Sequence, residues 1–85
     1  MYYIYIVECC DSSLYVGSTN NVEKRIEAHN HSKQGARYTK GRRPVTLRYV
    51  ESHPTLGQAL RREAEIKRWP RKKKLQLIVC SSIIL

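Results

Sequence analysis

The alternation of apolar and polar positions predicts a β-hairpin at the start of the chain. Residues 2–10, "YYIYIVECC", are dense in tyrosine and β-branched residues, which favours a strand. The "DSS" at 11–13 is a turn signal, and the "LYVG" that follows has the pattern of a returning strand. With a three-residue loop over 11–13, Tyr5 and Tyr15 project from the same face of the sheet, because side chains alternate along a strand.

A short amphipathic helix is predicted next, within "STNNVEKRIEAHN" at residues 18–30. Asn20 followed three residues later by Glu23 resembles a capping box. One side of the helix carries Val22, Arg25, Ile26 and His29, and the other carries Glu23, Lys24 and Glu27. We expect the helix to bury Val22 and Ile26, with Arg25 and His29 facing a groove beside them.

Two further segments complete an α/β pattern. "VTLRYVE" at 45–51 alternates as a third strand, with one face made of Val45, Leu47 and Tyr49. "HPTLGQALRREAEIKRW" at 53–69 predicts a second helix, in which Thr55 and Gln58 form a capping box. The apolar side of this helix carries Leu56, Ala59, Leu60, Glu63, Ile66 and Lys67. Pro70 ends the helix or begins a third one, "PRKKKLQLIV".

Length and charge predict one basic domain. Eighty-five residues without repeats predict a single domain over 1–85, with its core at about 2–79 and an apolar tail at 80–85. A net charge of +9 favours a polyanionic partner over the alternative of a merely basic protein. Basic residues gather in a long loop at 30–44, and long loops are usually functional or disordered. Its candidate nucleic-acid contacts are Arg37, Tyr38, Lys40, Arg42 and Arg43.

Cysteine usage and hydropathy bear on location. Cys9 and Cys10 are adjacent and Cys80 is distant, so no metal-ligand spacing is present. An odd number of cysteines with no recognisable signal peptide favours an intracellular protein, cytoplasmic or nucleoid-associated. The apolar stretch at 75–85 is too short to span a bilayer, so we expect a helix that packs onto the domain and no membrane partner.

Five residues are candidates for chemistry. Taken singly, Glu63 is explained by an ion pair with a nearby arginine or by a place at the rim of the core. Arg25 is explained by its stem lying over apolar surface, and His29 by a structural hydrogen bond. Taken with Tyr5 and Tyr15, they suggest phosphodiester cleavage. A carboxylate can hold a divalent ion together with water and a substrate phosphate. An arginine offers a planar fork to phosphate, and a tyrosine or histidine can position or deprotonate water.

These residues resemble the signature of the GIY-YIG nucleases. "YIY" at 3–5 and "YVG" at 15–17 are similar to the two halves of that signature, and Arg25 and His29 have the spacing of the family's helix. "EAEIK" at 63–67 resembles the family's metal-binding glutamate segment. The resemblance covers about residues 2–79 and is closest to the small standalone members. It implies an α/β (α+β) fold, a three-stranded antiparallel sheet flanked by helices.

The resemblance also implies a divalent-metal-dependent endonuclease that hydrolyses DNA and uses one Mg²⁺ or Mn²⁺. Glu63 would bind the metal, and Arg25 would stabilise charge on the phosphate. Tyr5 and Tyr15 would orient or activate the water, with His29 assisting, and the identity of the general base stays open.

The resemblance has two further implications. Gly17 would serve as a structural turn that lets the backbone leave the strand tightly. No second DNA-binding segment is recognisable among these 85 residues. We therefore expect selection of substrate structure rather than sequence, as in DNA repair or recombination.

Three departures from the family pattern keep alternatives open. Tyr3 replaces a usual glycine, Ser18 stands where some repair nucleases have a lysine, and no asparagine follows Asn30, although many relatives have one beyond the metal-binding helix. The missing asparagine and the basic loop with Tyr38 suit a non-catalytic module that binds DNA or RNA. A second alternative is an adaptor whose tail "LIVCSSIIL" docks on a protein partner.

Overall fold

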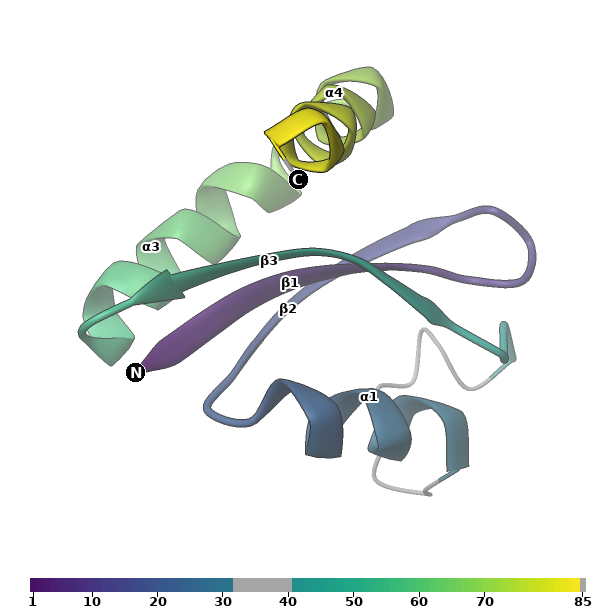
Figure 1. Ribbon diagram of the computed structural model, residues 1–85, viewed down its shortest axis with the longest axis horizontal. Coiled ribbons are helices and arrows are strands. Elements are labelled where there is room, and N and C mark those ends of the chain that lie inside the picture. Colours follow the sequence, from purple (N-terminus) through teal and green to yellow (C-terminus); the bar gives the residue numbers. More distant parts are fainter. Residues whose placement is uncertain (32–40, 85) are drawn as a thin grey trace.

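The computed structural model describes the backbone of residues 1–31 and 41–84, and the side chains of residues 1–31 and 41–80. Its elements are β1 (Tyr2–Glu8), β2 (Leu14–Thr19), α1 (Val22–His31), β3 (Thr46–His53), α3 (Leu56–Lys67) and α4 (Arg71–Ile84). The strands form one antiparallel sheet in the order β2-β1-β3 (Figure 1). This confirms the predicted three-stranded sheet flanked by helices.

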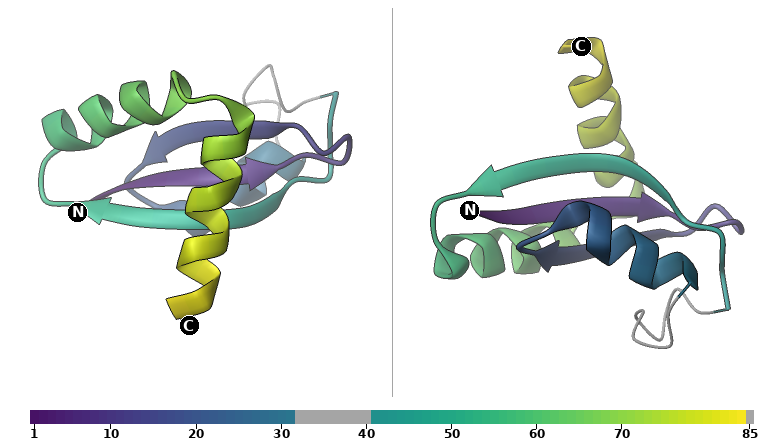
Figure 2. Two further views of the ribbon diagram at one scale, coloured as in Figure 1. Left: turned by 90° about the horizontal axis from the view of Figure 1, so that it is seen from above. Right: turned by 60° about the horizontal axis from the view of Figure 1, so that its bottom comes forward.

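Helices cover both faces of the sheet, with α1 on one face and α3 and α4 on the other (Figures 1 and 2). The core on the α3 and α4 side consists of Ile4, Ile6, Val16, Ala59, Ile66 and Ile78. The smaller core on the α1 side consists of Tyr5, Val7, Cys9 and Val45. The central strand β1 contributes to both cores, which explains why its sequence is a continuous apolar run.

The β1–β2 hairpin has a three-residue loop, one residue earlier than predicted. The Cys9 N–H donates to the Ser13 carbonyl at 2.8 Å, so the loop is 10–12 rather than 11–13. Ser12 closes the turn with a left-handed φ of 69°, as is common in three-residue hairpin loops. The pairing therefore shifts by two residues, and the predicted common face of Tyr5 and Tyr15 is confirmed.

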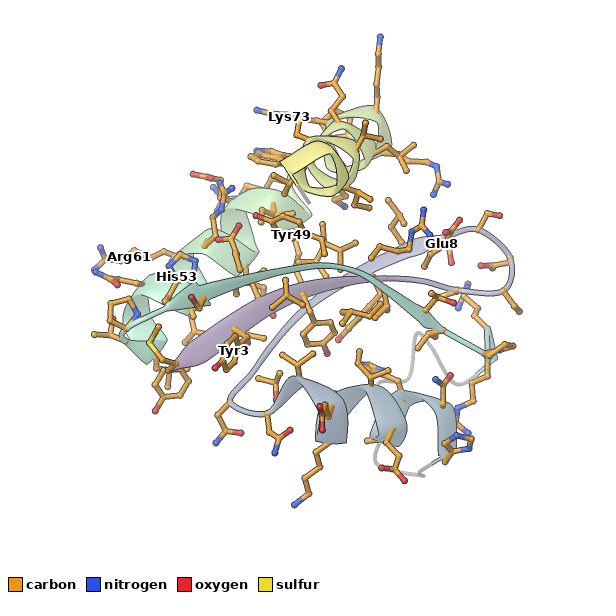
Figure 3. The ribbon with its side chains drawn as sticks, in the orientation of Figure 1. Tyr3, Glu8, Tyr49, His53, Arg61 and Lys73 are labelled. Atoms are coloured by element: carbon orange, nitrogen blue, oxygen red, sulfur yellow. The ribbon has the colours of Figure 1, made fainter. Side chains whose placement is uncertain are left out.

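A β-bulge divides the faces of β3. Ile6 pairs with Tyr49 and Val7 pairs with Leu47, so Arg48 is the extra residue between them. The extra residue reverses the alternation of side chains, so Leu47 and Tyr49 project from opposite faces of the sheet. Tyr49 therefore packs on the α3 and α4 side, where Figure 3 shows it, while Val45 packs on the α1 side. The prediction that Val45, Leu47 and Tyr49 share one face was wrong.

The two helix starts that were predicted from capping residues differ in outcome. Thr55 caps α3 as predicted, because its hydroxyl accepts a bond from the Gln58 N–H at 3.2 Å. At α1 the cap is Asn21 rather than Asn20, since the Lys24 N–H donates to the Asn21 side chain at 3.1 Å.

The third helix, α4, crosses the sheet and extends past the β3 edge (Figure 2, left). Ile78 is 5% exposed and belongs to the larger core, and Trp69 and Leu77 pack partly against it. This confirms that the helix packs onto the domain, while Leu75 and Val79 stay exposed. Over residues 1–31 and 41–84, every helix is too short or too polar to cross a membrane.

Candidate active site

Tyr5, Tyr15 and His29 form an aromatic cluster between the sheet and α1. The ring centroids of Tyr5 and Tyr15 are 6.5 Å apart, and those of His29 lie 5.7 Å from Tyr5 and 5.3 Å from Tyr15. The Tyr5 hydroxyl and the His29 Nε2 are joined by a buried hydrogen bond of 2.7 Å. The structure thus brings together three residues that the sequence placed on two strands and a helix.

Two members of this cluster are buried. Tyr5 is 1% exposed and His29 is 0% exposed, while Val22 and Ile26 are only half-buried. The expectation that His29 faces a groove beside a buried Val22 and Ile26 was therefore wrong. The hydrogen bond to the Tyr5 hydroxyl explains the burial, because a paired imidazole loses little on leaving water. Buried in this way, Tyr5 and His29 contact neighbouring side chains rather than solvent.

Both buried groups are neutral at physiological pH. Burial, reinforced by the positive charges of Arg25 and Arg43, lowers the pKa of His29 to about 4. Burial also raises the pKa of the Tyr5 phenol, although the hydrogen bond from Arg25 opposes the shift. The Tyr5–His29 bond is therefore an interaction between two uncharged groups, one of which donates and the other accepts.

Arg25 connects the buried pair to the surface. Its Nε donates to the Tyr5 hydroxyl at 3.4 Å, a long and weak hydrogen bond. Arg25 also borders a hollow of 270 Å³ where β2 meets α1, with the other lining residues Thr19, Asn20, Asn21, Lys24 and Ala28. An anion in this hollow would find a guanidinium and an ammonium within the same wall.

Gly17 has a packing role. It lies inside β2, directly opposite Tyr5, and its φ is not positive. A Cβ at position 17 would lie 2.4 Å from the Tyr5 hydroxyl oxygen and 2.5 Å from the ring carbon that bears it. The expected turn at Gly17 is therefore not observed. The glycine lets the Tyr5 ring lie across the backbone of β2.

Glu63 approaches the β2 edge from α3. Its side chain is 18% exposed, and the Lys67 Nζ lies 3.8 Å from its Oε2. The same Lys67 Nζ lies 5.9 Å from the centre of the Tyr15 ring, and Tyr15 is half-buried. Lys67 therefore joins the carboxylate to the aromatic cluster. Sequence reasoning placed Lys67 only on the apolar stripe, although its four-residue spacing from Glu63 was the available signal.

The site offers one carboxylate to a metal ion. Over the described residues, no group of three or more His, Cys, Asp or Glu side chains could hold an ion unaided. Magnesium is commonly held by one or two carboxylates, with water and substrate phosphate filling the other positions. Glu63 fits this mode as a single carboxylate, and its ion pair with the half-exposed Lys67 contributes at most about 1 kcal/mol.

Two of the five residues expected to contact nucleic acid are described. Arg43 is half-buried and donates to the carbonyls of Ala28 and His29, so it caps the C-terminal end of α1. Arg42 pairs with Asp11 of the hairpin loop at 3.1 Å, and its side chain is 39% exposed. Arg42 is thus accessible to a ligand, whereas Arg43 has a structural role. The other three, Arg37, Tyr38 and Lys40, lie outside the described residues.

Asn30 was missed as a structural residue. Its side-chain amide donates to the Val45 carbonyl at 3.2 Å and accepts from the Val45 N–H at 2.7 Å. These two bonds tie the end of α1 to the start of β3 and so hold His29 against the sheet. No periodicity marks such a long-range pair, because Asn30 and Val45 are brought together only by the fold.

Comparison with known proteins identifies the family. The profile of the GIY-YIG catalytic domain matches residues 1–76. A UPF0213 protein of Syntrophus aciditrophicus is 54% identical over 76 residues, which cover 89% of this chain and 87% of the relative. Another from Staphylococcus saprophyticus is 57% identical over 77 residues, covering 91% and 93%.

A solved structure is also similar. The solution NMR structure of a UPF0213 protein from Bacillus halodurans aligns with a TM-score of 0.60 and 43% identity, covering 94% of this chain and 85% of that one. The fold and these matches lead to the same assignment. The chain belongs to the GIY-YIG family, within which its relatives are UPF0213 proteins.

Proposed function

We propose that the protein is a divalent-metal-dependent endonuclease that hydrolyses DNA phosphodiester bonds. The observation that carries the proposal is the contact of Tyr15 and Arg25 with the buried Tyr5–His29 pair, together with Lys67, which links Tyr15 to Glu63. Membership of a family defined by its catalytic domain points to nucleic acid as the substrate class. The net charge of +9 suits a polyanionic substrate.

Arg25 binds the phosphate in this proposal. Its guanidinium borders the polar hollow between β2 and α1, where Lys24 adds a second positive charge. Fixed cations beside a phosphate stabilise the charge that grows on its oxygens during cleavage.

Tyr15 orients the attacking water. It is half-buried beside His29 and lies near Lys67, which pairs with Glu63. Tyr5 and His29 hold this geometry as positioning residues, because their burial keeps them from the substrate. A divalent ion at Glu63 supplies electrostatic stabilisation to the phosphate and the leaving oxygen.

We expect substrate structure to govern where cleavage occurs. The proposed phosphate contacts, Arg25 and Lys24, are cations, and contacts to the backbone carry no sequence information. Branched, nicked or single-stranded DNA would then be chosen by how well its backbone fits the β2 edge. Such selectivity suits DNA repair or recombination inside the cell.

One observation favours a second candidate, a nucleic-acid-binding module without turnover. The Lys67 ammonium lies 3.8 Å from the Glu63 carboxylate, where it neutralises the group that would hold the metal. If this pair persists when nucleic acid binds, the protein grips DNA or RNA and cleaves neither.

The deciding experiment is a cleavage panel. Branched, nicked and single-stranded DNA are incubated with the protein and magnesium, manganese or a chelator. The matched variants are Glu63→Gln and Glu65→Gln, which make the same change two residues apart on α3. We expect metal-dependent cleavage that Glu63→Gln abolishes and Glu65→Gln keeps. Cleavage that survives in chelator or in Glu63→Gln contradicts the proposal, and binding without cleavage in any metal establishes the second candidate.

A further inference from the structure

A basic surface lies where α3 turns into α4. Its cations are Lys67, Arg68, Arg71, Lys72, Lys73 and Lys74, which we call the α3–α4 corner. No acidic residue follows Glu65 anywhere in the sequence. Of these cations only Lys67 borders the candidate active site, so the proposed chemistry leaves the other five unexplained.

Helix stability does not account for these charges. Four of them occupy the first turn of α4, which contains no acidic residue. The aligned peptide dipoles make that end of a helix positive, so cations there are unfavourable and acidic residues would be preferred. The corner therefore costs the folded protein stability, and a bound polyanion would relieve the repulsion.

Contacts with Trp69 restrain part of the corner. The Lys73 ammonium lies 4.3 Å from the centre of the indole ring, and the Arg62 guanidinium lies 5.1 Å from it. Trp69 itself is half-buried against the larger core. Figure 3 shows Lys73 on the side of α4 that faces away from the sheet. A cation restrained in this way loses less entropy when it binds an anion.

The corner is continuous with the candidate active site through Lys67. The Lys67 Nζ lies 3.8 Å from Glu63 and 5.9 Å from the Tyr15 ring, and the next residue, Arg68, already belongs to the turn into α4. In Figure 2 (left) α3 runs along the β2 side of the sheet up to this turn. A chain of phosphates that reached Tyr15 would therefore meet further cations along the corner.

We propose that the α3–α4 corner binds the sugar-phosphate backbone of the nucleic acid next to the phosphate held at the active site. The contacts are ionic and read no bases, because they are made by flexible cations to phosphate oxygens. The inference rests on the proposed function only for its ligand, a nucleic acid. It adds a binding surface that extends the substrate beyond the catalytic cluster.

The test uses Arg71→Gln/Lys72→Gln, which removes two charges from exposed positions. Binding of a labelled DNA duplex and of a labelled single strand is measured in chelator over a series of salt concentrations. We expect the double variant to bind several-fold more weakly at moderate salt. The plot of log affinity against log salt should become shallower by about 0.9 per lost duplex contact and about 0.7 per lost single-strand contact. The melting temperature should stay unchanged or rise, because two cations leave the positive end of a helix.

Arg48→Gln is the control, since it removes one charge from a side chain that is 48% exposed on β3. Wild-type affinity in Arg71→Gln/Lys72→Gln overturns the inference, and so does an equal loss per charge in Arg48→Gln, which would show a general charge effect. The binding measurement and the cleavage panel can fail separately. Weaker binding by the corner variant in a protein that never cleaves keeps the surface and rejects the nuclease. A protein that cleaves DNA, and whose corner variant binds as well as wild type, keeps the nuclease and rejects the surface.

Discussion

The Tyr5 ring lies so close to Gly17 that a Cβ at that position would come within 2.4 Å of the phenolic oxygen. The two residues are directly opposed on β1 and β2. Tyr5 in turn bonds His29 and receives a bond from Arg25, so the position of the ring sets the position of both. The absence of a side chain at Gly17 is therefore a requirement of the whole cluster.

The first prediction is that Gly17→Ala destabilises the protein by about 1–3 kcal/mol, because the Tyr5 ring must shift inside a packed core. The ring shift would also break the Tyr5–His29 bond. Urea unfolding measures the change. Gly57→Ala is the matched control, since a Cβ at position 57 would have nothing within 4 Å and alanine favours the helix. Equal stability of Gly17→Ala and wild type would contradict the observed packing.

The second prediction concerns the pH dependence of stability. The pKa of His29 is about 4 in the folded protein, compared with 6.5 when unperturbed. The unfolded chain therefore binds more protons between these values, and stability falls as the pH drops from 6.5 towards 4. The slope contributed by one such group is about 1.4 kcal/mol per pH unit, and the total loss is on the order of 3 kcal/mol.

His29→Gln should remove that slope. Urea unfolding between about pH 7 and pH 5 isolates the effect, because Asp11 and Glu51 have lowered pKa values and titrate below this range. Wild-type stability should fall across the range while the stability of His29→Gln stays nearly flat. Parallel curves for the two proteins would show that His29 is not buried in its neutral form.

Local signals predicted the fold well, but not the details that depend on pairing. Strand β1 and the Thr55 cap of α3 could be predicted, because each depends on residues that are neighbours in sequence. The bulge at Arg48 was not, because "VTLRYVE" alternates regularly and the extra residue is defined only by its pairing with β1. For the same reason the hairpin loop was predicted one residue late.

The candidate site shows the same division. The spacing of Arg25 and His29 placed both on one side of a helix, and strand alternation placed Tyr5 and Tyr15 on one face. Which of these residues would be buried could not be read from spacing. An ionisable residue on the apolar side of a helix can lie exposed at the edge of the core, or it can be buried with a hydrogen-bond partner, and the spacing is the same in both cases. For His29 the partner is the Tyr5 hydroxyl, which is distant in sequence and so could not be identified from the helix pattern.

The third prediction separates two adjacent asparagines at the start of α1. Asn21→Ala should cost about 1 kcal/mol, because the Lys24 N–H loses its side-chain acceptor. Asn20→Ala should cost less than half as much, since Asn20 precedes the cap and is exposed. Urea unfolding of both variants measures the difference. A larger loss in Asn20→Ala would restore the cap expected from the capping-box pattern.

The fourth prediction distinguishes the two tyrosines by what their hydroxyls do. Tyr15→Phe should lower the cleavage rate at saturating DNA by about 10²-fold or more, the range for a group that orients or activates water. Its stability should stay near that of wild type, because Tyr15 is only half-buried.

Tyr5→Phe should lower stability by about 1–3 kcal/mol, since the buried His29 Nε2 loses its partner. Any loss of rate in Tyr5→Phe would then follow from displaced neighbours. Single-turnover cleavage and urea unfolding of both variants check this division. A stable Tyr5→Phe protein that cannot cleave, beside a fully active Tyr15→Phe, would instead make the buried tyrosine the reacting one.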